Sequence, residues 1–431
     1  MNPRNEKYKS WDVKSLKNRF VKLLVAPELG GRILQVEMDG HEFLFVNPLL
    51  EGKLPDETRL GENGAWLNFG GEKIWPAPQG WNTREQWSGP PDPVLDSGIY
   101  DFNTERDENN EVALVLQSPV DERTGLQIRR KISLEKNRAA VVVEASFVNK
   151  TNRPLNWSLW SVVQMNTPGE SDGRYRVICP VNPNSKFEQG YKVMHGLANS
   201  PQNQYDTFGN VVVSYQYLVG KIGLDANAGW MAMLDSILGK VFVLRFECEE
   251  NETYPDNTSM QVWTQGRGII FSRNRIAEFV SDRVQNPPYL EMEILSPIKT
   301  IEAGKHIQFN YKMLCTTISS CNESICNVNT LAAVASPLNC EMISENTIIG
   351  ARYGVFSEGK IRVLLRINSG NNNLQETILY EKDVSPFVAT DFSFSVKSRL
   401  LVGKNISLLA MKYDMDDIFQ GVIEQIKFKN T

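Results

Sequence analysis

The chain has little histidine and lacks long apolar runs and a basic excess. Its 431 residues include three histidines, and no stretch approaches the roughly 20 apolar residues that a membrane span requires. Lys and Arg total 46 against 51 Asp and Glu, which gives a net charge of −5. Such a surface is a poor match for a phosphate backbone. We therefore expect neither a nucleic-acid partner nor a membrane partner.

The start of the sequence does not resemble a secretory leader, and helical periodicity is scarce. The first residues, MNPRNEKYKSW, are polar and contain no apolar segment typical of a signal peptide. We therefore expect a cytoplasmic location. Only TREQW (residues 83–87) and IAEFVSDRVQ (residues 276–285) are compatible with one or two helical turns each.

The cysteine spacing disfavours a metal site. Four of the six cysteines lie between residues 315 and 340 with the spacing C-x5-C-x4-C-x13-C. Structural zinc sites usually have tighter C-x2–4-C pairs, so we expect no metal and no cofactor. A disulfide would require export, and free thiols near a domain junction are the simpler interpretation.

Strand signals are abundant. Residues 20–47 contain apolar runs separated by Gly-Gly and Asp-Gly, which predicts strand–turn–strand–turn–strand. The β-branched residues crowded in residues 139–149 are typical of a strand buried on both faces. Many short strands with regular turn signals predict an all-β fold, either a large β-sandwich or a barrel.

The strand pattern restarts after about residue 325. Residues 321–342 are small, polar and weakly periodic, as a linker would be, and a second set of short strands follows. All nine tryptophans and all three histidines precede this second set. We expect a large domain over residues 15–315 and a separate small β-sandwich over residues 330–431.

The segment NFGGEKIWPAPQGW, which begins at Asn68, concentrates aromatic and polar groups. Its glycines and prolines predict neither a helix nor a plain strand. Trp75 and Trp81 offer flat faces, and Lys73 and Gln79 join Asn68 as hydrogen-bonding groups. Sugars suit such a mixture, because a pyranose has an apolar face and a rim of hydroxyls. The alternative is a structural loop whose tryptophans plug the end of a sandwich.

Two strand-like segments add groups of the same kind. Alternation in WSLWSVVQMN places Trp160 and Gln164 on one face, which is unusual for a core and natural for a pocket wall. In PPYLEMEILSP, Glu291 and Glu293 share a face, where each would raise the pKa of the other if buried. Such a pair suits a general acid or base. The alternative is an exposed strand face with two solvated carboxylates.

Seven motifs, taken in order along the chain, resemble the galactose mutarotase-like superfamily. They are APELGGRILQVEMDGHEFLFVNP, NFGGEKIWPAPQ, WSGPPDP, WSLWSVVQ, the GW pair ending at Trp230, YPD at residues 254–256, and YLEMEILSP. More narrowly, they resemble an uncharacterised branch, a domain of unknown function, in which the Gly-Gly-x-Lys-x-Trp-Pro-Ala-Pro-Gln run is the signature. The resemblance spans residues 15–315 and implies a β-supersandwich followed by a small C-terminal β-sandwich.

The resemblance also implies a mechanism and shows where this chain departs from it. In the true mutarotases a Glu takes the proton from the anomeric hydroxyl and a His donates to the ring oxygen, so that the ring opens and recloses. By position, the Glu matches Glu291 or Glu293. The family run Asn-x-His-Gly-Gly reads Asn-Phe-Gly-Gly from Asn68 onward, and Gln164 stands near the second family histidine. Neither the Phe of this run nor Gln164 can shuttle a proton as a histidine does. This departure argues against mutarotation itself and leaves sugar binding open.

Two other groups are candidate acids. His195 lies in the predicted loop KVMHGLANSPQNQY, whereas His41 and His306 fall at peripheral strand positions. A lone histidine in a loop is more often simply exposed. Lys73 would serve as an acid if desolvation lowers its pKa toward neutrality.

The sequence therefore predicts a carbohydrate-active protein, an aldose-epimerase-like enzyme that acts on a sugar or sugar derivative with a Glu general base. The alternatives are a non-catalytic carbohydrate-binding protein and a polysaccharide lyase or hydrolase. The predicted partner is a small-molecule carbohydrate, with the C-terminal sandwich adding a second contact or a homodimer surface. The candidate catalytic residues are Glu291, Glu293, Lys73 and His195, and the candidate substrate-binding residues are Asn68, Trp75, Gln79, Trp81, Trp160, Gln164 and Trp230.

Overall fold

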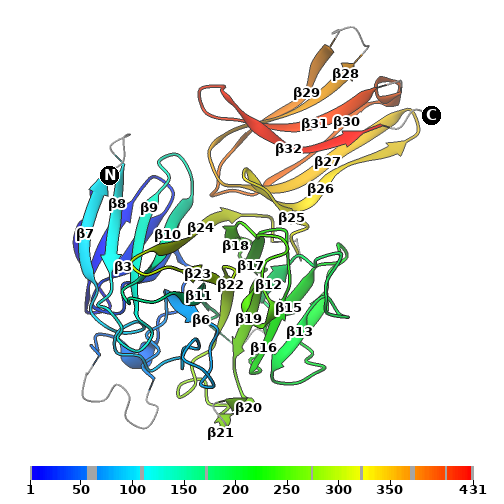
Figure 1. The fold of residues 1–431 in the computed structure, drawn as a ribbon. Coiled ribbons are helices and arrows are strands. Elements are labelled where there is room, and N and C mark those ends of the chain that lie inside the picture. Colours follow the sequence, from blue (N-terminus) through cyan, green and yellow to red (C-terminus); the bar gives the residue numbers. More distant parts are fainter. Residues whose placement is uncertain are drawn as a thin grey trace. The chain divides into compact units, whose positions relative to one another are not determined.

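The computed structural model describes residues 2–55, 66–106, 111–169, 173–272, 275–320, 324–368, 374–402 and 405–428. Within these ranges the chain is built from β-strands, and its helical segments are three short 3-10 turns, η1 (Pro48–Leu50), η2 (Pro255–Asn257) and η3 (Ser398–Leu401) (Figure 1). The predicted all-β fold is confirmed.

Neither of the two segments compatible with helical turns forms a helix, although residues 283–285 form a turn in which the backbone N–H of Asn286 donates to the backbone oxygen of Asp282. Residues 83–87 form turns, and residues 276–279 belong to strand β21 (Arg275–Phe279), which pairs with β20 (Gly268–Ser272) in a two-stranded hairpin. In this hairpin Ile276 lies opposite Phe271. Cross-strand pairing of large apolar side chains therefore replaces the helical turn.

The chain divides into two compact units. The first comprises Met1–Lys136, Ala140–Met233 and Val243–Leu314, and the second comprises Asn137–Ala139, Leu234–Phe242 and Cys315–Thr431. The domain limits expected from the sequence, residues 15–315 and 330–431, remain a proposal.

A twelve-stranded antiparallel sheet forms one layer of the first unit, counted over the described residues. Its order is β1 (Arg4–Tyr8), β2 (Trp11–Lys17), β3 (Lys22–Ala26), β4 (Arg32–Met38), β6 (Glu72–Ala77), β11 (Leu155–Asn166), β22 (Tyr289–Leu295), β19 (Met260–Gln265), β16 (Gly220–Leu224) and β13 (Lys192–His195). Two short strands flank this path, β5 (His41–Glu42) beside β4 and β23 (Lys299–Ile301) beside β11.

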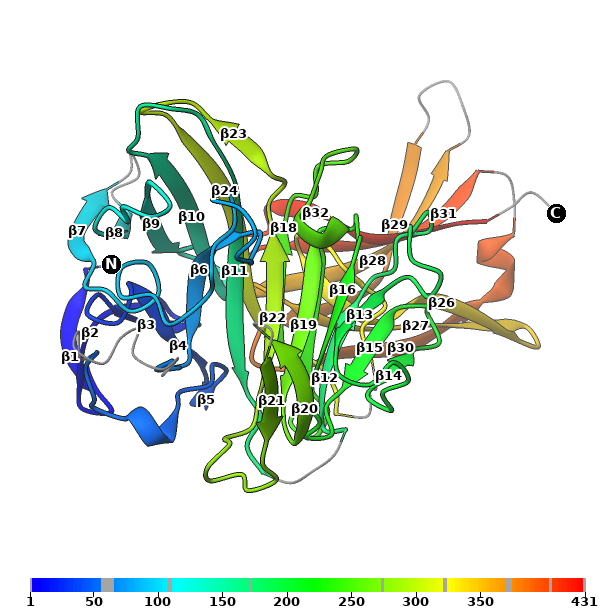
Figure 2. The same ribbon diagram turned by 60° about the horizontal axis from the view of Figure 1, so that its bottom comes forward.

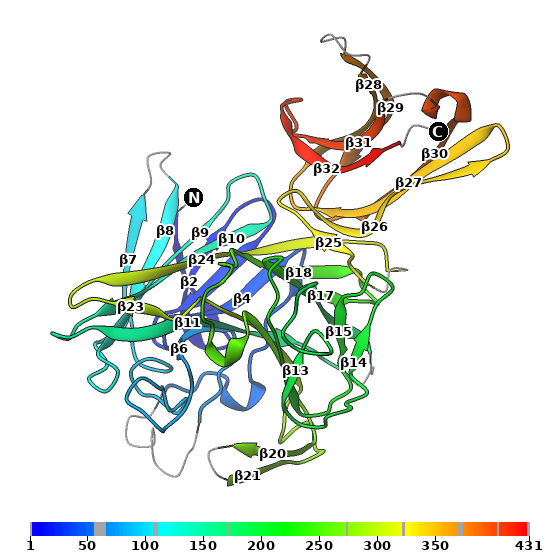
Figure 3. The ribbon, with the colours of Figure 1, turned by 45° about the vertical axis from the view of Figure 1, so that its right-hand side comes forward.

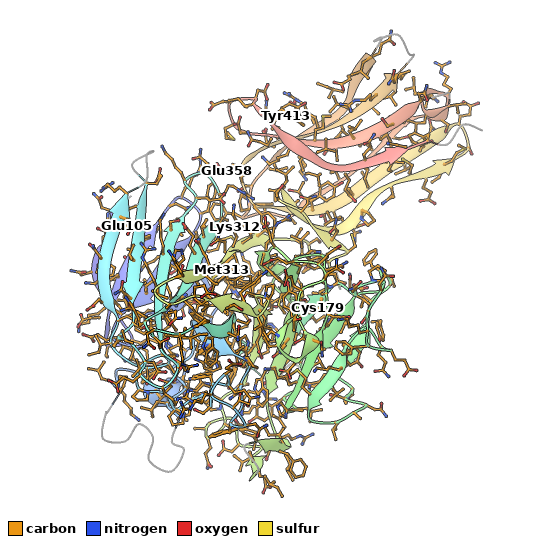
Figure 4. All side chains as sticks on the ribbon, viewed as in Figure 1. Glu105, Cys179, Lys312, Met313, Glu358 and Tyr413 are labelled. Carbon is orange, nitrogen blue, oxygen red and sulfur yellow. The ribbon has the colours of Figure 1, made fainter. Side chains whose placement is uncertain are left out.

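The second large sheet has ten strands among the described residues. Its order is β14 (Asn203–Tyr205), β15 (Val211–Ser214), β12 (Tyr175–Cys179), β17 (Trp230–Asp235), β18 (Lys240–Phe246), β24 (His306–Thr317), β10 (Ala140–Asn149), β9 (Leu126–Leu134), β8 (Val112–Gln117) and β7 (Asp101–Arg106). Glu105 marks the edge strand β7, and Met313 lies on the more central strand β24 (Figure 4).

The two large sheets face each other across buried polar contacts as well as an apolar core. Glu72 on β6 accepts hydrogen bonds from Arg130 on β9 and Tyr311 on β24, and from Ser161 Oγ on β11 at 3.3 Å. All four residues are at most 2% exposed. Paired and hydrogen-bonded burial of this kind is how an interior tolerates charge.

Strand β6 corrects the sequence interpretation of its segment. The residues from Glu72 to Ala77 form a fully buried strand that pairs with β11 along its length, whereas β4 contacts it only where Ile33 lies opposite Glu72. Pro76 therefore falls where β6 needs hydrogen bonds on one side only, the position at which a sheet accepts proline. Gly70 and Gly71, with φ of 93° and 74°, form the turn that precedes the strand rather than breaking it.

The second unit is a small β-sandwich, shown as two layers in Figure 3. One sheet has the order β25 (Asn327–Val328), β26 (Ala332–Ile343), β27 (Asn346–Val355) and β30 (Thr390–Lys397); the other has the order β29 (Leu374–Val384), β28 (Gly359–Asn368), β31 (Ile406–Tyr413) and β32 (Phe419–Lys427). Val334 and Tyr353 of the first sheet pack in one core with Val363 and Leu408 of the second.

The described residues contain free thiols but no metal-binding cluster and no helix of the membrane-spanning type. Cys179, Cys248, Cys315 and Cys340 are free thiols, and Cys321 lies outside the described residues. Within the described chain, no cluster of His, Cys, Asp and Glu side chains has an arrangement that could hold a metal ion. Over the same residues, no helix combines the length and apolar character needed to cross a bilayer.

Candidate functional site

One face of the twelve-stranded sheet gathers most of the residues singled out in the sequence. Strands β6, β11, β22, β19 and β16 lie side by side (Figure 2). In their register Trp75 lies opposite Trp160, Gln164 opposite Glu291, and Gln261 opposite Glu293. Because residues two apart share a face, these side chains, together with Lys73 and Lys221, occupy one face, which we call the site face. Glu72 and Ser161 occupy the opposite face, toward the other sheet.

Glu293 is the most deeply buried acid on the site face. Its side chain is fully enclosed, and Oε2 accepts hydrogen bonds from Trp160 Nε1 and Lys221 Nζ, both at 2.8 Å. Its other oxygen, Oε1, has no hydrogen-bond partner in the described part of the chain. Burial raises the pKa of Glu293 to about 7, although Lys221 opposes the shift. This carboxyl is therefore poised to exchange a proton near neutral pH.

Glu291 lies two residues away and has a neutral partner. Gln164 Nε2 donates to Glu291 Oε1 at 2.6 Å, and both side chains are buried. The amide oxygen of Gln164 has no hydrogen-bond partner among the described residues. The alternative of two solvated carboxylates on an exposed strand is wrong, because β22 is a central strand whose residues are all buried.

Lys73 lies between two indole rings. Its Nζ is 4.8 Å from the ring centroid of Trp75 and 5.7 Å from that of Trp66. Lys73 is 2% exposed, and its Nζ makes no hydrogen bond to any described residue. Burial lowers the pKa of Lys73 to about 8, with Glu291 opposing the shift. Contact with the indole faces compensates part of the cost of burying the ammonium.

Asp96, which the sequence interpretation missed, holds these indoles in place. Its Oδ1 accepts from Trp75 Nε1 at 3.0 Å and from Arg32 at 3.3 Å, and its Oδ2 accepts from Trp66 Nε1 at 3.1 Å. Trp75 is only 4% exposed and also packs against Trp160 and Trp87. The ring of Trp75 therefore supports the site from within and is not an open stacking surface for a ligand.

An open pocket of about 360 Å³ lies beside Glu293, and we call it the site pocket. Its lining includes Gln79, Trp160, Lys192, His195, Lys221, Pro255, Asp256 and Gln261. Trp160 and Lys221 both hydrogen-bond to Glu293, so the carboxyl lies directly behind the pocket wall. The Lys221 ammonium lies 4.7 Å from the ring centroid of Trp160.

His195 reaches this pocket from a strand, not from the predicted loop. It ends β13, where it lies opposite Lys221 on β16 beside a register shift. Its ring is 6.1 Å from that of Trp263. Burial, followed by the charge of Lys221, lowers the pKa of His195. The imidazole is thus mostly neutral at pH 7 and able to donate one hydrogen bond.

Five expected substrate contacts are not among the residues that line the site pocket: Trp75 and Gln164, which lie elsewhere on the site face, and Trp230, Trp81 and Asn68. Trp230 belongs to β17 of the other large sheet and is 2% exposed. Trp81 lies beyond the end of β6 and is 56% exposed. The Asn68 side chain accepts from the backbone nitrogen of Gly70, a local turn bond. Proximity in the sequence, or in the order of motifs, did not place these side chains together in space.

The sequence interpretation also missed Lys221 and Gln261. Each lies on a short strand without a distinctive motif, and each reaches the site only through the register of β16 and β19 with β22. The alternation of residues within each strand could have suggested their faces. Their neighbours could not be read from the sequence, because strand order is set by contacts far apart in the chain.

Known structures resemble this chain at low sequence identity. A galactose mutarotase-like protein from Clostridium acetobutylicum is 12% identical, with 73% of this chain and 98% of that chain covered and a TM-score of 0.45. A galactose mutarotase-like protein from Lactobacillus casei is 13% identical, with 70% and 99% covered and a TM-score of 0.44. A TPR-domain containing protein from Parabacteroides distasonis is 11% identical, with 71% and 47% covered and a TM-score of 0.44, so this chain spans about half of its length.

The family assignment comes from the sequence of the first unit. Residues 13–313 match the family model described as "Domain of unknown function (DUF4380)". The match includes strands β6, β11, β16, β19 and β22, which carry the site face. Because it extends over more than half of the 431 residues, the chain belongs to the DUF4380 family.

Proposed function

We propose that this protein is carbohydrate-active and binds a sugar or sugar derivative in the site pocket. A pocket of about 360 Å³ falls within the size range of small-molecule sites. The indole of Trp160 supplies an apolar wall, and the amides of Gln79 and Gln261 supply donors and acceptors for hydroxyl groups. A monosaccharide needs this combination of surfaces.

We further propose proton transfer of the aldose-epimerase type, with Glu293 as the general base. The observation that carries this proposal is a buried carboxyl with a pKa of about 7 directly behind the pocket wall. Glu293 would take the proton of the anomeric hydroxyl, and the electron pair of that O–H bond would form the carbonyl as the bond from carbon to the ring oxygen breaks. The neutral imidazole of His195 would donate a hydrogen bond to the ring oxygen, which would take its proton from solvent in the open pocket, and reclosure on the other face would reverse both proton transfers.

A non-catalytic carbohydrate-binding protein is the second candidate, and the enclosure of Glu293 favours it. Trp160 and Lys221 occupy Oε2 and stand between the carboxyl and the pocket. In that case the Lys221–Glu293 pair would fix the pocket wall and Lys221 would hydrogen-bond the ligand. Proton transfer would then be absent although a sugar binds.

Nuclear magnetic resonance of freshly dissolved α-glucose or α-galactose separates the two candidates. For an enzyme, anomer exchange accelerates in the presence of the protein, and Glu293→Gln lowers the acceleration by 10²-fold or more. Glu122→Gln, at an exposed position, is the matched control and leaves the rate unchanged. Saturation transfer to the sugar without faster exchange supports the binding protein. If neither signal appears with any sugar of a broad panel, the carbohydrate proposal is wrong.

A further inference from the structure

A second pocket, of about 500 Å³, lies next to the site pocket in the first unit. The two pockets share the turn formed by residues 254–257. Tyr254 and Asn257 line the second pocket, whereas Pro255 and Asp256 line the site pocket. One ligand that crosses this turn would therefore contact both.

Four asparagine side chains line the second pocket and have no hydrogen-bond partner among the described residues. They are Asn184, Asn227, Asn251 and Asn257. Each amide offers two donor hydrogens and an acceptor oxygen. Hydroxyl groups, which both donate and accept, are natural partners for such amides. All four side chains are exposed to solvent, so a polyhydroxylated ligand would replace the water around these amides with its own hydroxyl groups.

The walls of the second pocket are held by internal contacts. Asp225 accepts from Ser185 Oγ at 2.6 Å and from the backbone nitrogen of Lys186 at 2.7 Å. Lys299 pairs with Glu249 at 2.7 Å and with Glu252 at 3.1 Å. The lining carries four carboxylates, those of Asp225, Glu249, Glu250 and Glu252, against one cation, Lys186, so the pocket is acidic overall. An acidic wall repels phosphate and carboxylate groups and so disfavours an anionic ligand, and the hydroxyl groups that suit the amides make a neutral sugar the ligand that fits.

The turn between the pockets is fixed as well. Lys192 Nζ donates to the backbone oxygen of Asp256 at 2.5 Å. Asp256 and Asn257 both have left-handed backbone conformations, with φ of 55° and 58°. Glu249 donates its backbone N–H to the hydroxyl of Tyr254 at 2.9 Å. These hydrogen bonds hold the turn that separates the two pockets, and two sites on either side of one turn suit successive units of one chain molecule.

We infer that the second pocket is a saccharide subsite and that the ligand is a neutral oligosaccharide extending across the 254–257 turn. This inference rests on the proposed function, since the first sugar unit would occupy the site pocket. It narrows the substrate class from a free monosaccharide to the end of a longer neutral chain.

Calorimetric titration with sugars of increasing length tests the inference. The probes are glucose and galactose with the neutral di- and trisaccharides of each. The wild-type protein is expected to bind a matching trisaccharide roughly tenfold more tightly than the monosaccharide, because two added hydrogen bonds contribute about 1.4 kcal/mol together. The double variant Asn184→Ala, Asn227→Ala is expected to lose this advantage and to keep the monosaccharide affinity. Asn152→Ala, exposed in the turn between β10 and β11, is the matched control.

Each other result has a distinct meaning. Equal affinity for monosaccharide and trisaccharide overturns the inference and leaves the proposed function standing. Failure to bind sugars of any length overturns both. An equal loss of monosaccharide and trisaccharide affinity in the double variant also overturns the inference, because the second pocket would then not be a separate subsite. Circular dichroism of the variant establishes that it is folded before these comparisons are made.

Discussion

At the scale of single residues, the tryptophans of the site act through their N–H groups and ring faces toward other protein groups. Trp160 donates to Glu293, and Trp75 donates to Asp96. The ring of Trp160 faces the ammonium of Lys221, and that of Trp75 faces Lys73. Indoles therefore position the charged groups, and only Trp160 of these two lines the open pocket.

The acid–base character of the site depends on the ion pair between Lys221 and Glu293. Because the pKa of Glu293 is about 7, the fraction in the base form, and hence the rate of anomer exchange, is expected to rise as pH increases through 7. Lys221 stabilises the ionised form and lowers this pKa. Lys221→Met therefore raises the pKa of Glu293 and moves the acidic limb of the pH–rate profile to higher pH.

The matched control for this variant is Lys192→Met. Lys192 also lines the site pocket but makes its hydrogen bond to a backbone oxygen rather than to Glu293. Lys192→Met should therefore leave the position of the acidic limb of the pH–rate profile unchanged. An unmoved limb in Lys221→Met would show that another group sets it.

At the scale of elements, strand β6 separates two kinds of buried charge. Alternation sends Glu72 toward the ten-stranded sheet, where it pairs with Arg130, and sends Lys73 to the site face. The ion pair of Glu72 with Arg130 joins the two sheets, whereas Lys73 belongs to the site. A one-residue slip in the register of β6 would exchange these roles.

The buried ion pair between Glu72 on β6 and Arg130 on β9 leads to a stability prediction. Arg130→Met leaves the buried carboxylate of Glu72 without its cation and is expected to lower the free energy of unfolding by about 3–5 kcal/mol. The double variant Glu72→Leu, Arg130→Met removes both charges and is expected to recover most of this loss. Urea unfolding of Arg130→Met, Glu72→Leu and the double variant measures the three losses, and a double variant whose loss equals the sum of the two single losses would contradict the coupling.

The neighbouring arginine provides a control for this experiment. Arg129 lies next in the same strand but on the outer face, where it pairs with Glu105 of the edge strand β7. Such exposed pairs contribute about 0–1 kcal/mol. Arg129→Met is therefore expected to change the free energy of unfolding far less than Arg130→Met.

At the scale of the whole molecule, buried thiols report on unfolding. Cys179 lies in β12 of the first unit (Figure 4), and Cys315 lies in β24 at the start of the second unit. Both are fully buried, and burial raises the pKa of each thiol. The reactive thiolate is thus both rare and inaccessible in the folded protein.

Alkylation by iodoacetamide tests this expectation. Cys179 and Cys315 should remain unmodified in native buffer at pH 7.5 over an hour and become modified in concentrated guanidinium chloride, as followed by peptide mass spectrometry. A reducing agent should leave the melting temperature unchanged, because Cys179, Cys248, Cys315 and Cys340 are free thiols. Rapid modification of either thiol in the native protein would mean that its unit opens readily.

The sequence by itself determined the features that depend on local periodicity. It predicted the all-β class, the second set of strands after residue 325, and the shared faces of Trp160 with Gln164 and of Glu291 with Glu293. A strand repeats every two residues, so the side on which a residue lies is encoded within a few positions.

Tertiary structure alone decided which strands became neighbours and therefore which groups met. It brought Lys221 to Glu293 across 72 residues of sequence and Asp96 to Trp75 across 21, and it placed Trp230 in the other sheet. It also set the protonation of the site, since the pKa values of Glu293 and Lys73 are shifted mainly by burial. Burial and strand order result from the packing of the whole chain, and no local pattern of residues contains them.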